Sequence, residues 1–134
     1  MPKQQTIHIS SAHGQPISLQ LEAVKPITLD MYANDIFETF GKQEDIVALP
    51  VVNSKQEVAG LITRRKLMAA FSHAFSRELN RHKQADMILE KQPLIFDNHT
   101  DLETVSQAVT QRKTSRAFDP VIFTQDGKYL GMLS

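Results

Sequence analysis

The sequence contains the same strand-turn-strand phrase twice. The first copy, LPVVNSKQEVAGLIT, covers residues 49–63, and the second, PVIFTQDGKYLGMLS, covers residues 120–134. Superimposing Gly60 on Gly131 gives an offset of 71 residues, 131 minus 60. Leu49, Val51 and Val52 then fall on Pro120, Ile122 and Phe123. A phrase that recurs at a fixed spacing indicates two related units in one chain.

The composition excludes several classes of protein. The chain has 134 residues, 15 basic and 15 acidic side chains, and no cysteine. Without cysteine there is no thiolate metal site or disulfide framework, so a cytoplasmic location is expected. The charge balance removes the usual signature of a general nucleic-acid binder. No stretch is apolar over the length of a membrane span, so no membrane contact is expected.

The first unit is expected over residues 17–82, after a flexible lead at residues 1–16. Pro26 keeps the preceding segment extended, and a helix follows with Thr28 or Asp30 as its N-cap and Gly41 as its C-terminal stop. The apolar spacing predicts that this helix turns one face to the core. That face comprises Met31, Ala33, Ile36, Phe37 and Phe40.

A buried strand is expected at residues 48–52, followed by the turn NSKQE and a partner strand that ends near Thr63. A second helix starts there. Its apolar spacing predicts an inward stripe of Leu67, Ala70, Phe71, Ala74, Phe75 and Leu79.

The second unit is expected over residues 83–134 and repeats this order. A short helix in QADMILE precedes the strand PLIFD, and Thr100 or Asp101 caps the next helix. Its inward positions are Leu102, Val105, Ala108 and Val109. Asp126-Gly127 between apolar strands predicts a tight hairpin, because such a turn needs positive φ. The copy ends at Ser134, before its last helix.

With these elements in place, the sequence resembles a tandem pair of cystathionine-β-synthase (CBS) domains, a Bateman module, from about Leu19 to Ser134. The resemblance implies an α+β fold of two β-α-β-β-α units packed sheet to sheet about a pseudo-two-fold axis, the second lacking its final helix. Residues 71–89 and 118–133 are similar to CBS pairs fused to GGDEF and EAL domains of cyclic di-GMP signalling proteins.

The resemblance implies a regulatory module rather than an enzyme, because the GGDEF and EAL catalytic segments are absent from this chain. It implies binding of an adenosine-containing ligand such as AMP, ATP or S-adenosylmethionine, or another small anion, in the cleft between the units, with no required cofactor. The alternative is a ligand-free scaffold that dimerises a fused effector domain. A homodimer is expected in either case.

Carried over by position, the ligand-binding residues implied by the resemblance are Thr28, Pro50, Ile62, Thr63, Arg65, Lys66 and Ser134. The family phrase at the end of the last strand has an aspartate that accepts hydrogen bonds from ribose hydroxyls. Lys66 stands at that position and can only donate. The matching position of the second copy lies three residues past Ser134.

Arg64, Arg65 and Lys66 are three cations in the first turn of a helix, where the helix dipole disfavours positive charge. One interpretation is that an anion binds there, helped by backbone N–H groups and the Thr63 hydroxyl. The other is a solvated basic run paired with surface carboxylates such as Glu57.

Other chemistry lacks its required residues. The histidines have no metal-ligand spacing, although one helical turn separates His73 from Arg77. Glu44-Asp45 fits a polar loop better than acid-base catalysis, and no nucleophile or glycine-rich phosphate loop is present. Four aromatic side chains that could stack on bases lie in apolar periodic runs and are assigned to the core. They are Phe71, Phe75, Phe96 and Phe123.

Overall fold

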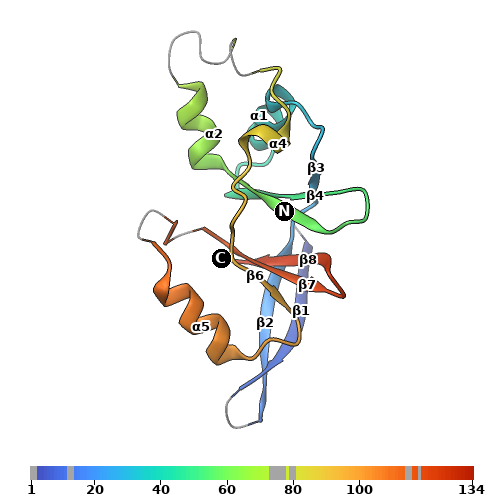
Figure 1. Cartoon of the computed structure of the whole chain (residues 1–134), viewed down its shortest axis with the longest axis vertical. Coiled ribbons are helices and arrows are strands. Elements are labelled where there is room, and N and C mark those ends of the chain that lie inside the picture. The colour runs from blue at the N-terminus through green and yellow to red at the C-terminus, as the bar shows by residue number, and fades with distance from the viewer. Residues whose placement is uncertain (1–2, 12–13, 73–77, 79–80, 114–115, 118) are drawn as a thin grey trace. The chain divides into compact units, whose positions relative to one another are not determined.

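The computed structural model describes residues 3–11, 14–72, 78, 81–113, 116–117 and 119–134. Within these ranges it contains both sheets and helices, which confirms the expected mixed α+β fold (Figure 1). The strands are β1 (Lys3–Ser10), β2 (Pro16–Ala23), β3 (Ile27–Thr28), β4 (Ala48–Val52), β5 (Val58–Thr63), β6 (Ile95–Asp97), β7 (Val121–Gln125) and β8 (Lys128–Leu133). The helices are α1 (Ala33–Lys42), α2 (Arg64–Phe71), α4 (Ala85–Ile88) and α5 (Leu102–Gln111).

The chain folds into two compact units. One contains Lys25–Gln92, and the other combines Pro2–Val24 with Pro93–Ser134. We call them unit 1 and unit 2. Unit 1 has the sheet β3-β4-β5, and unit 2 has the sheet β1-β2-β8-β7-β6. This division differs from the sequence-based one, because β2 pairs with β1 and β8 and so belongs to the sheet of the second repeat.

In unit 1, helices α1 and α2 lie together on one side of the three-stranded sheet (Figure 1). Strand β4 is the middle strand, and all five of its residues are buried, as the continuous apolar run predicts. Strand β3 pairs with it in parallel and β5 in antiparallel register. Asn53 shapes the intervening turn by accepting hydrogen bonds from the N–H groups of Lys55 and Glu57.

Helix α1 begins later than predicted. Its N-cap is Tyr32, without a side-chain hydrogen bond, and Thr28 instead donates to the Asp30 carboxylate at 2.6 Å. The first helical N–H groups are satisfied by main-chain oxygens from a distant loop, as in the 2.7 Å bond from Ala33 to Lys83. A tertiary contact therefore replaces the expected cap. Gly41 is inside the helix rather than at its end.

Three of the five predicted inward side chains of α1 are fully buried, namely Ala33, Ile36 and Phe40. In α2, Leu67 is buried and Phe71 is half-buried, whereas Ala70 is exposed, contrary to the prediction. Phe71 stacks on Phe37 with ring centroids 5.1 Å apart. The predicted positions Ala74, Phe75 and Leu79, and the His73–Arg77 pair, lie outside the described residues.

Unit 2 begins with a strand where a flexible lead was expected. Residues 3–10 form β1 and pair with the whole of β2. Ile7 and Ile9 alternate with exposed polar residues and enter a core with Leu21, Val121 and Phe123. Because side chains alternate along a strand, Ile7 and Ile9 lie on the same face of β1. This face packs on the core, although the segment is otherwise polar.

Helix α5 and the β7–β8 hairpin of unit 2 follow the prediction. Helix α5 is capped by Asp101, whose carboxylate accepts the Thr104 N–H at 2.8 Å, and it buries Val105. The β7–β8 hairpin turns at Asp126 and Gly127 with φ of 53° and 81°. Positive φ at both central residues is the geometry that the Asp-Gly pair predicts.

The alignment of the two copies is corrected by one residue in their first strands. Val51 pairs with Gly60, whereas Phe123 pairs with Gly131. Val51 therefore matches Phe123 rather than Ile122. The turn of the second copy is one residue shorter, so a single offset cannot serve both strands. Since successive side chains of a strand point to opposite faces, this slip exchanges the faces in the comparison.

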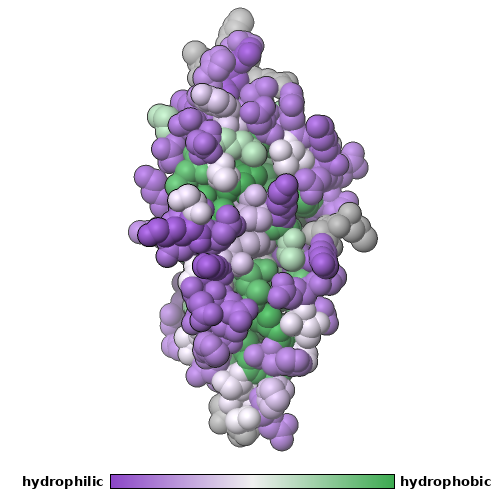
Figure 2. Space-filling view, turned by 90° about the vertical axis from the view of Figure 1, so that its right-hand side faces the viewer, coloured by the Kyte–Doolittle hydropathy of each residue, from purple (hydrophilic) through white to green (hydrophobic). Residues whose placement is uncertain are grey.

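On the face shown in Figure 2, polar side chains predominate and apolar ones form patches between them. Among the helices in the described part of the chain, none has the length and apolar character needed to cross a bilayer.

Candidate functional site

Unit 1 contains a cavity of about 260 Å³ beside helix α2. Residues from β5, α1, α2 and the segment after α4 contribute to its wall. Most of that wall is apolar, and it includes Ala33, Leu61, Ile62, Leu67, Phe71 and Ile88. Apolar surface with a few polar groups at its edge is the usual composition of a small-molecule site.

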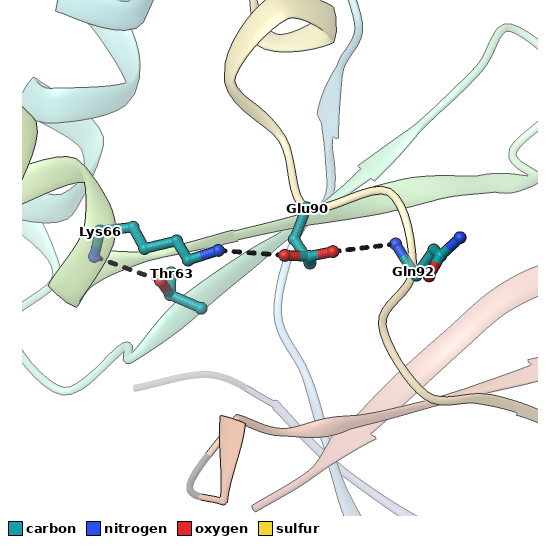
Figure 3. Close-up of polar contacts among 4 residues, drawn as sticks. All are labelled: Thr63, Lys66, Glu90 and Gln92. Carbon is teal, nitrogen blue, oxygen red and sulfur yellow. Dashed lines mark hydrogen bonds and ion pairs between the residues drawn. The ribbon is translucent and has the colours of Figure 1, made fainter. Parts of the chain in front are cut away.

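The polar lining of the cavity comes from Thr63, Lys66, Lys83 and Glu90. Figure 3 shows Lys66 and Glu90 pointing toward each other, with Lys66 Nζ 3.0 Å from Glu90 Oε2. The side chain of Glu90 is only 13% exposed and that of Lys66 is 52% exposed. Since a carboxylate withdrawn from water needs a partner, Lys66 stabilises the charge of Glu90.

The main chain of Glu90 is fixed against β5. Glu90 donates to the Leu61 carbonyl at 2.7 Å and accepts from the Leu61 N–H at 3.0 Å. A Cβ at Gly60 would overlap the Leu89 side chain and the Glu90 carbonyl oxygen. Gly60 is therefore required for this close approach, which brings Glu90 to the cavity.

At the N-terminus of α2, two backbone N–H groups already have acceptors within unit 1. Arg64 donates its N–H to Val47 at 2.8 Å, and Lys66 donates its N–H to the Thr63 hydroxyl at 3.2 Å. These contacts leave fewer N–H groups for an anion than a free helix end has. Any anion bound here must depend mainly on side chains.

The guanidinium of Arg64 is held by contacts within unit 1. It donates to the carbonyls of Ile46 at 2.8 Å and Gln43 at 2.6 Å, and it lies over the Phe40 ring, 4.8 Å from the centroid. Gln43 is the C-cap of α1, where a cation is favourable. The contacts of Arg64 and Lys66 therefore favour the paired interpretation of the basic run for these two residues. The carboxylate partner is Glu90 rather than Glu57, which accepts from Asn53.

Of the seven sequence-predicted site residues, the cavity brings together Ile62, Thr63 and Lys66. Thr28, Pro50 and Arg65 belong to unit 1 but are not among the lining residues, and Pro50 is fully buried. Ser134 follows β8 in unit 2. A ligand-binding role for all seven residues stays a prediction.

Sequence reasoning missed Glu90, although the sequence carries a signal for it. The dipeptide Leu-Glu occurs shortly before a proline in both copies, as Leu21-Glu22 and Leu89-Glu90. Glu22 pairs with Met132 as Glu90 bridges to Leu61, and a Cβ at Gly131 would press on Leu21. Each Leu-Glu pair therefore packs against the glycine of a final strand, Gly60 of β5 or Gly131 of β8.

Other candidate residues have ordinary structural places. His8 shares a 3.1 Å hydrogen bond with Ser18, and Glu44-Asp45 is an exposed turn, as predicted. Phe123 is buried in the unit 2 core with Phe96 beside it. Within the described residues, no three side chains of metal-binding type come together.

Residues 21–73 match the family model of the CBS domain. The structure resembles CBSX2, a CBS-pair protein from Arabidopsis thaliana, with a TM-score of 0.65 at 19% identity, covering 83% of this chain and 79% of that one. A structure of CBSX2 in complex with AMP gives 0.63 at 18%, covering 83% and 81%. The cytosolic domain of the Mg²⁺ channel MgtE in complex with ATP gives 0.64 at 15%, covering 83% and 42%. A search of curated proteins finds no significant match.

The chain therefore has the fold of a tandem CBS-domain pair.

Proposed function

We propose that this chain is a ligand-sensing regulatory module whose unit 1 cavity binds an adenosine-type nucleotide or another small anion. The observation that carries the proposal is the composition of the cavity wall. The apolar side chains of the wall lie beside the Thr63 hydroxyl and the ammonium groups of Lys66 and Lys83.

The dimensions fit part of such a ligand. Small-molecule pockets enclose roughly 300–1,000 Å³, so a cavity of about 260 Å³ takes a nucleobase or a similar flat apolar group and leaves the remainder outside. The half-buried Phe71 ring, already stacked on Phe37, offers an aromatic wall. Lysine ammonium groups at the edge favour a phosphate or other anion.

The relatives support the same class of ligand, since CBSX2 has been solved with AMP and MgtE with ATP. We propose AMP, ATP and S-adenosylmethionine as candidates. The location between the two repeats that the sequence resemblance implies stays a prediction.

We also propose that the parent protein is a cytoplasmic diguanylate cyclase or cyclic di-GMP phosphodiesterase. The support is the similarity of residues 71–89 and 118–133 to CBS pairs fused to GGDEF and EAL domains. Occupancy of the cavity would then change the activity of the fused catalytic domain. Assays of the parent protein with and without AMP test this part: equal cyclase and phosphodiesterase activities in both conditions would reject it.

Calorimetric titration of the chain with AMP, ATP, S-adenosylmethionine and inorganic phosphate tests the binding proposal. Ala70→Leu fills the cavity without removing a polar group, because Ala70 lines it from the exposed side of α2. Ala69→Leu is the matched control, one position away on the same helix and outside the lining. We expect Ala70→Leu to weaken binding about tenfold or more and Ala69→Leu to leave it unchanged.

At a hundredfold excess over Kd, a ligand adds about 2.7 kcal/mol to the free energy of unfolding. A chain of this size should then melt several degrees higher. If none of the four compounds binds or raises the Tm, the binding proposal is rejected.

A second candidate is the ligand-free dimerisation scaffold. Two large apolar side chains of unit 1 favour it: Tyr32 at the start of α1 is 48% exposed, and Met87 of α4 is 70% exposed. Exposed apolar groups of this size can support a contact between copies. In sedimentation at the same concentration, we expect the natural chain to be a dimer and the double variant Tyr32→Ser, Met87→Ser to be a monomer. A natural chain that stays monomeric at high concentration would exclude this candidate.

A further inference from the structure

Glu90 is held by both its main chain and its side chain. Its carboxylate contacts Lys66 through Oε2 at 3.0 Å, while Oε1 accepts the Gln92 N–H at 3.2 Å (Figure 3). Two main-chain hydrogen bonds to Leu61 fix the position from which this side chain extends. The main chain of Glu90 is therefore fixed beside the cavity, and its carboxylate contacts Lys66.

The same carboxylate already contacts Lys66, the cation that an entering anion would contact. Lys66 lines the cavity and supplies positive charge there, but Glu90 already neutralises that charge within 3.0 Å. A ligand anion near Lys66 must either replace Glu90 or accept repulsion from it.

We propose that Glu90 is the residue that sets the anion affinity of the cavity, by acting as a built-in counter-ion of Lys66. An entering anionic group takes over Lys66, and the Glu90 side chain rotates toward solvent. The inference rests on the proposed binding function and identifies what regulates that site. Because Glu90 competes, the cavity favours a phosphate dianion over a singly charged carboxylate.

Replacement of Glu90 by a ligand anion at Lys66 also affects the chain outside the cavity. The Gln92 N–H is bonded to Glu90 Oε1, and residues 91–94 lead directly into β6. When the carboxylate leaves Lys66, the hydrogen bond from the Gln92 N–H to Glu90 Oε1 is lost, whereas the Glu90 N–H keeps its bond to Leu61. Occupancy therefore loosens the segment between Glu90 and β6 and leaves the main-chain bridge in place.

The test is Glu90→Gln, which removes the charge but retains an oxygen for the Gln92 N–H. Glu57→Gln is the matched control: it makes the same change of net charge in the β4–β5 turn, where Glu57 contacts Asn53 and does not line the cavity. The probes are AMP and inorganic phosphate, titrated by calorimetry. We expect Glu90→Gln to bind either probe about fivefold more tightly and Glu57→Gln to bind as the natural sequence does.

Amide hydrogen exchange gives a second measurement on the natural sequence. Saturation with AMP should accelerate exchange at Gln92 and leave exchange at Glu90 unchanged. If the natural chain binds AMP but Glu90→Gln binds no more tightly, the counter-ion inference is overturned while the binding function stands. If neither form binds either probe, both fail. A gain in both glutamine variants would show a nonspecific charge effect and would also overturn the inference.

Discussion

Leu61 and Glu90 are joined by a reciprocal pair of main-chain hydrogen bonds, 3.0 Å from the Leu61 N–H and 2.7 Å to the Leu61 carbonyl. This bridge adds the segment after α4 to the exposed edge of β5. It depends on Gly60, because the Glu90 carbonyl occupies the space that a Cβ would need. Gly60 is therefore required because the main chain of Glu90 comes close to it, and not because its φ is positive.

Gly60→Ala should destabilise the chain by about 1–3 kcal/mol, the usual cost of overpacking. The main-chain atoms of Glu90 cannot withdraw without breaking the bridge to Leu61. Gly41→Ala is the control, since a Cβ at Gly41 meets nothing within 4 Å and the residue is helical. It should stabilise by about 0.4–1 kcal/mol. Urea unfolding measures both, and equal effects of the two substitutions would contradict this assignment.

Arg64→Ala should lower the free energy of unfolding by about 1.5–3 kcal/mol, the range for hydrogen bonds of a charged group. The substitution leaves the Gln43 and Ile46 carbonyls without the guanidinium. Arg64→Lys should recover only part of the loss, because an ammonium cannot make both bonds with the same geometry. Lys55→Ala, at an exposed turn position, should stay within about 0.5 kcal/mol. Full recovery in Arg64→Lys would argue against the two-carbonyl contact.

Thr63→Ala should cost about 1 kcal/mol through loss of the N-cap of α2. The Thr63 hydroxyl accepts the Lys66 N–H, and alanine leaves that donor unsatisfied. Thr63→Ser retains the hydroxyl and should keep most of the stability. Thermal unfolding of both variants checks the prediction, which fails if serine is as destabilising as alanine.

Asp101 gives a pH-dependent prediction. Hydrogen bonds from the Thr104 side chain and from the Thr104 N–H hold the pKa of this carboxyl below its ordinary value of 3.8. Because the folded pKa is lowered, the cap contributes its full stabilisation above the ordinary pKa and loses it as the pH falls through the lowered value. The stability difference between the natural chain and Asp101→Ala should therefore shrink as the pH is lowered from about 5 to below the lowered pKa. A difference that stays constant over this range would contradict the assigned role.

Local sequence patterns predict the features that depend on neighbouring residues. Turn chemistry located the Asp126-Gly127 hairpin, capping located the start of α5, and apolar runs located the paired strands. These features are fixed by backbone preferences and side-chain periods within a few residues, so they can be read locally. The family resemblance named Ile62, Thr63 and Lys66 as ligand-binding residues, and these three line the cavity, while their binding role stays a prediction.

The features that depend on distant partners are set by tertiary contacts. Helix α1 starts at Ala33 because a carbonyl 50 residues away accepts its N–H, and β1 is a strand because β2 and the unit 2 core complete it. Glu90 reaches Lys66 across 24 residues of chain because its main chain binds β5. Such pairings are set by packing and register across the sheet, which the local pattern does not contain.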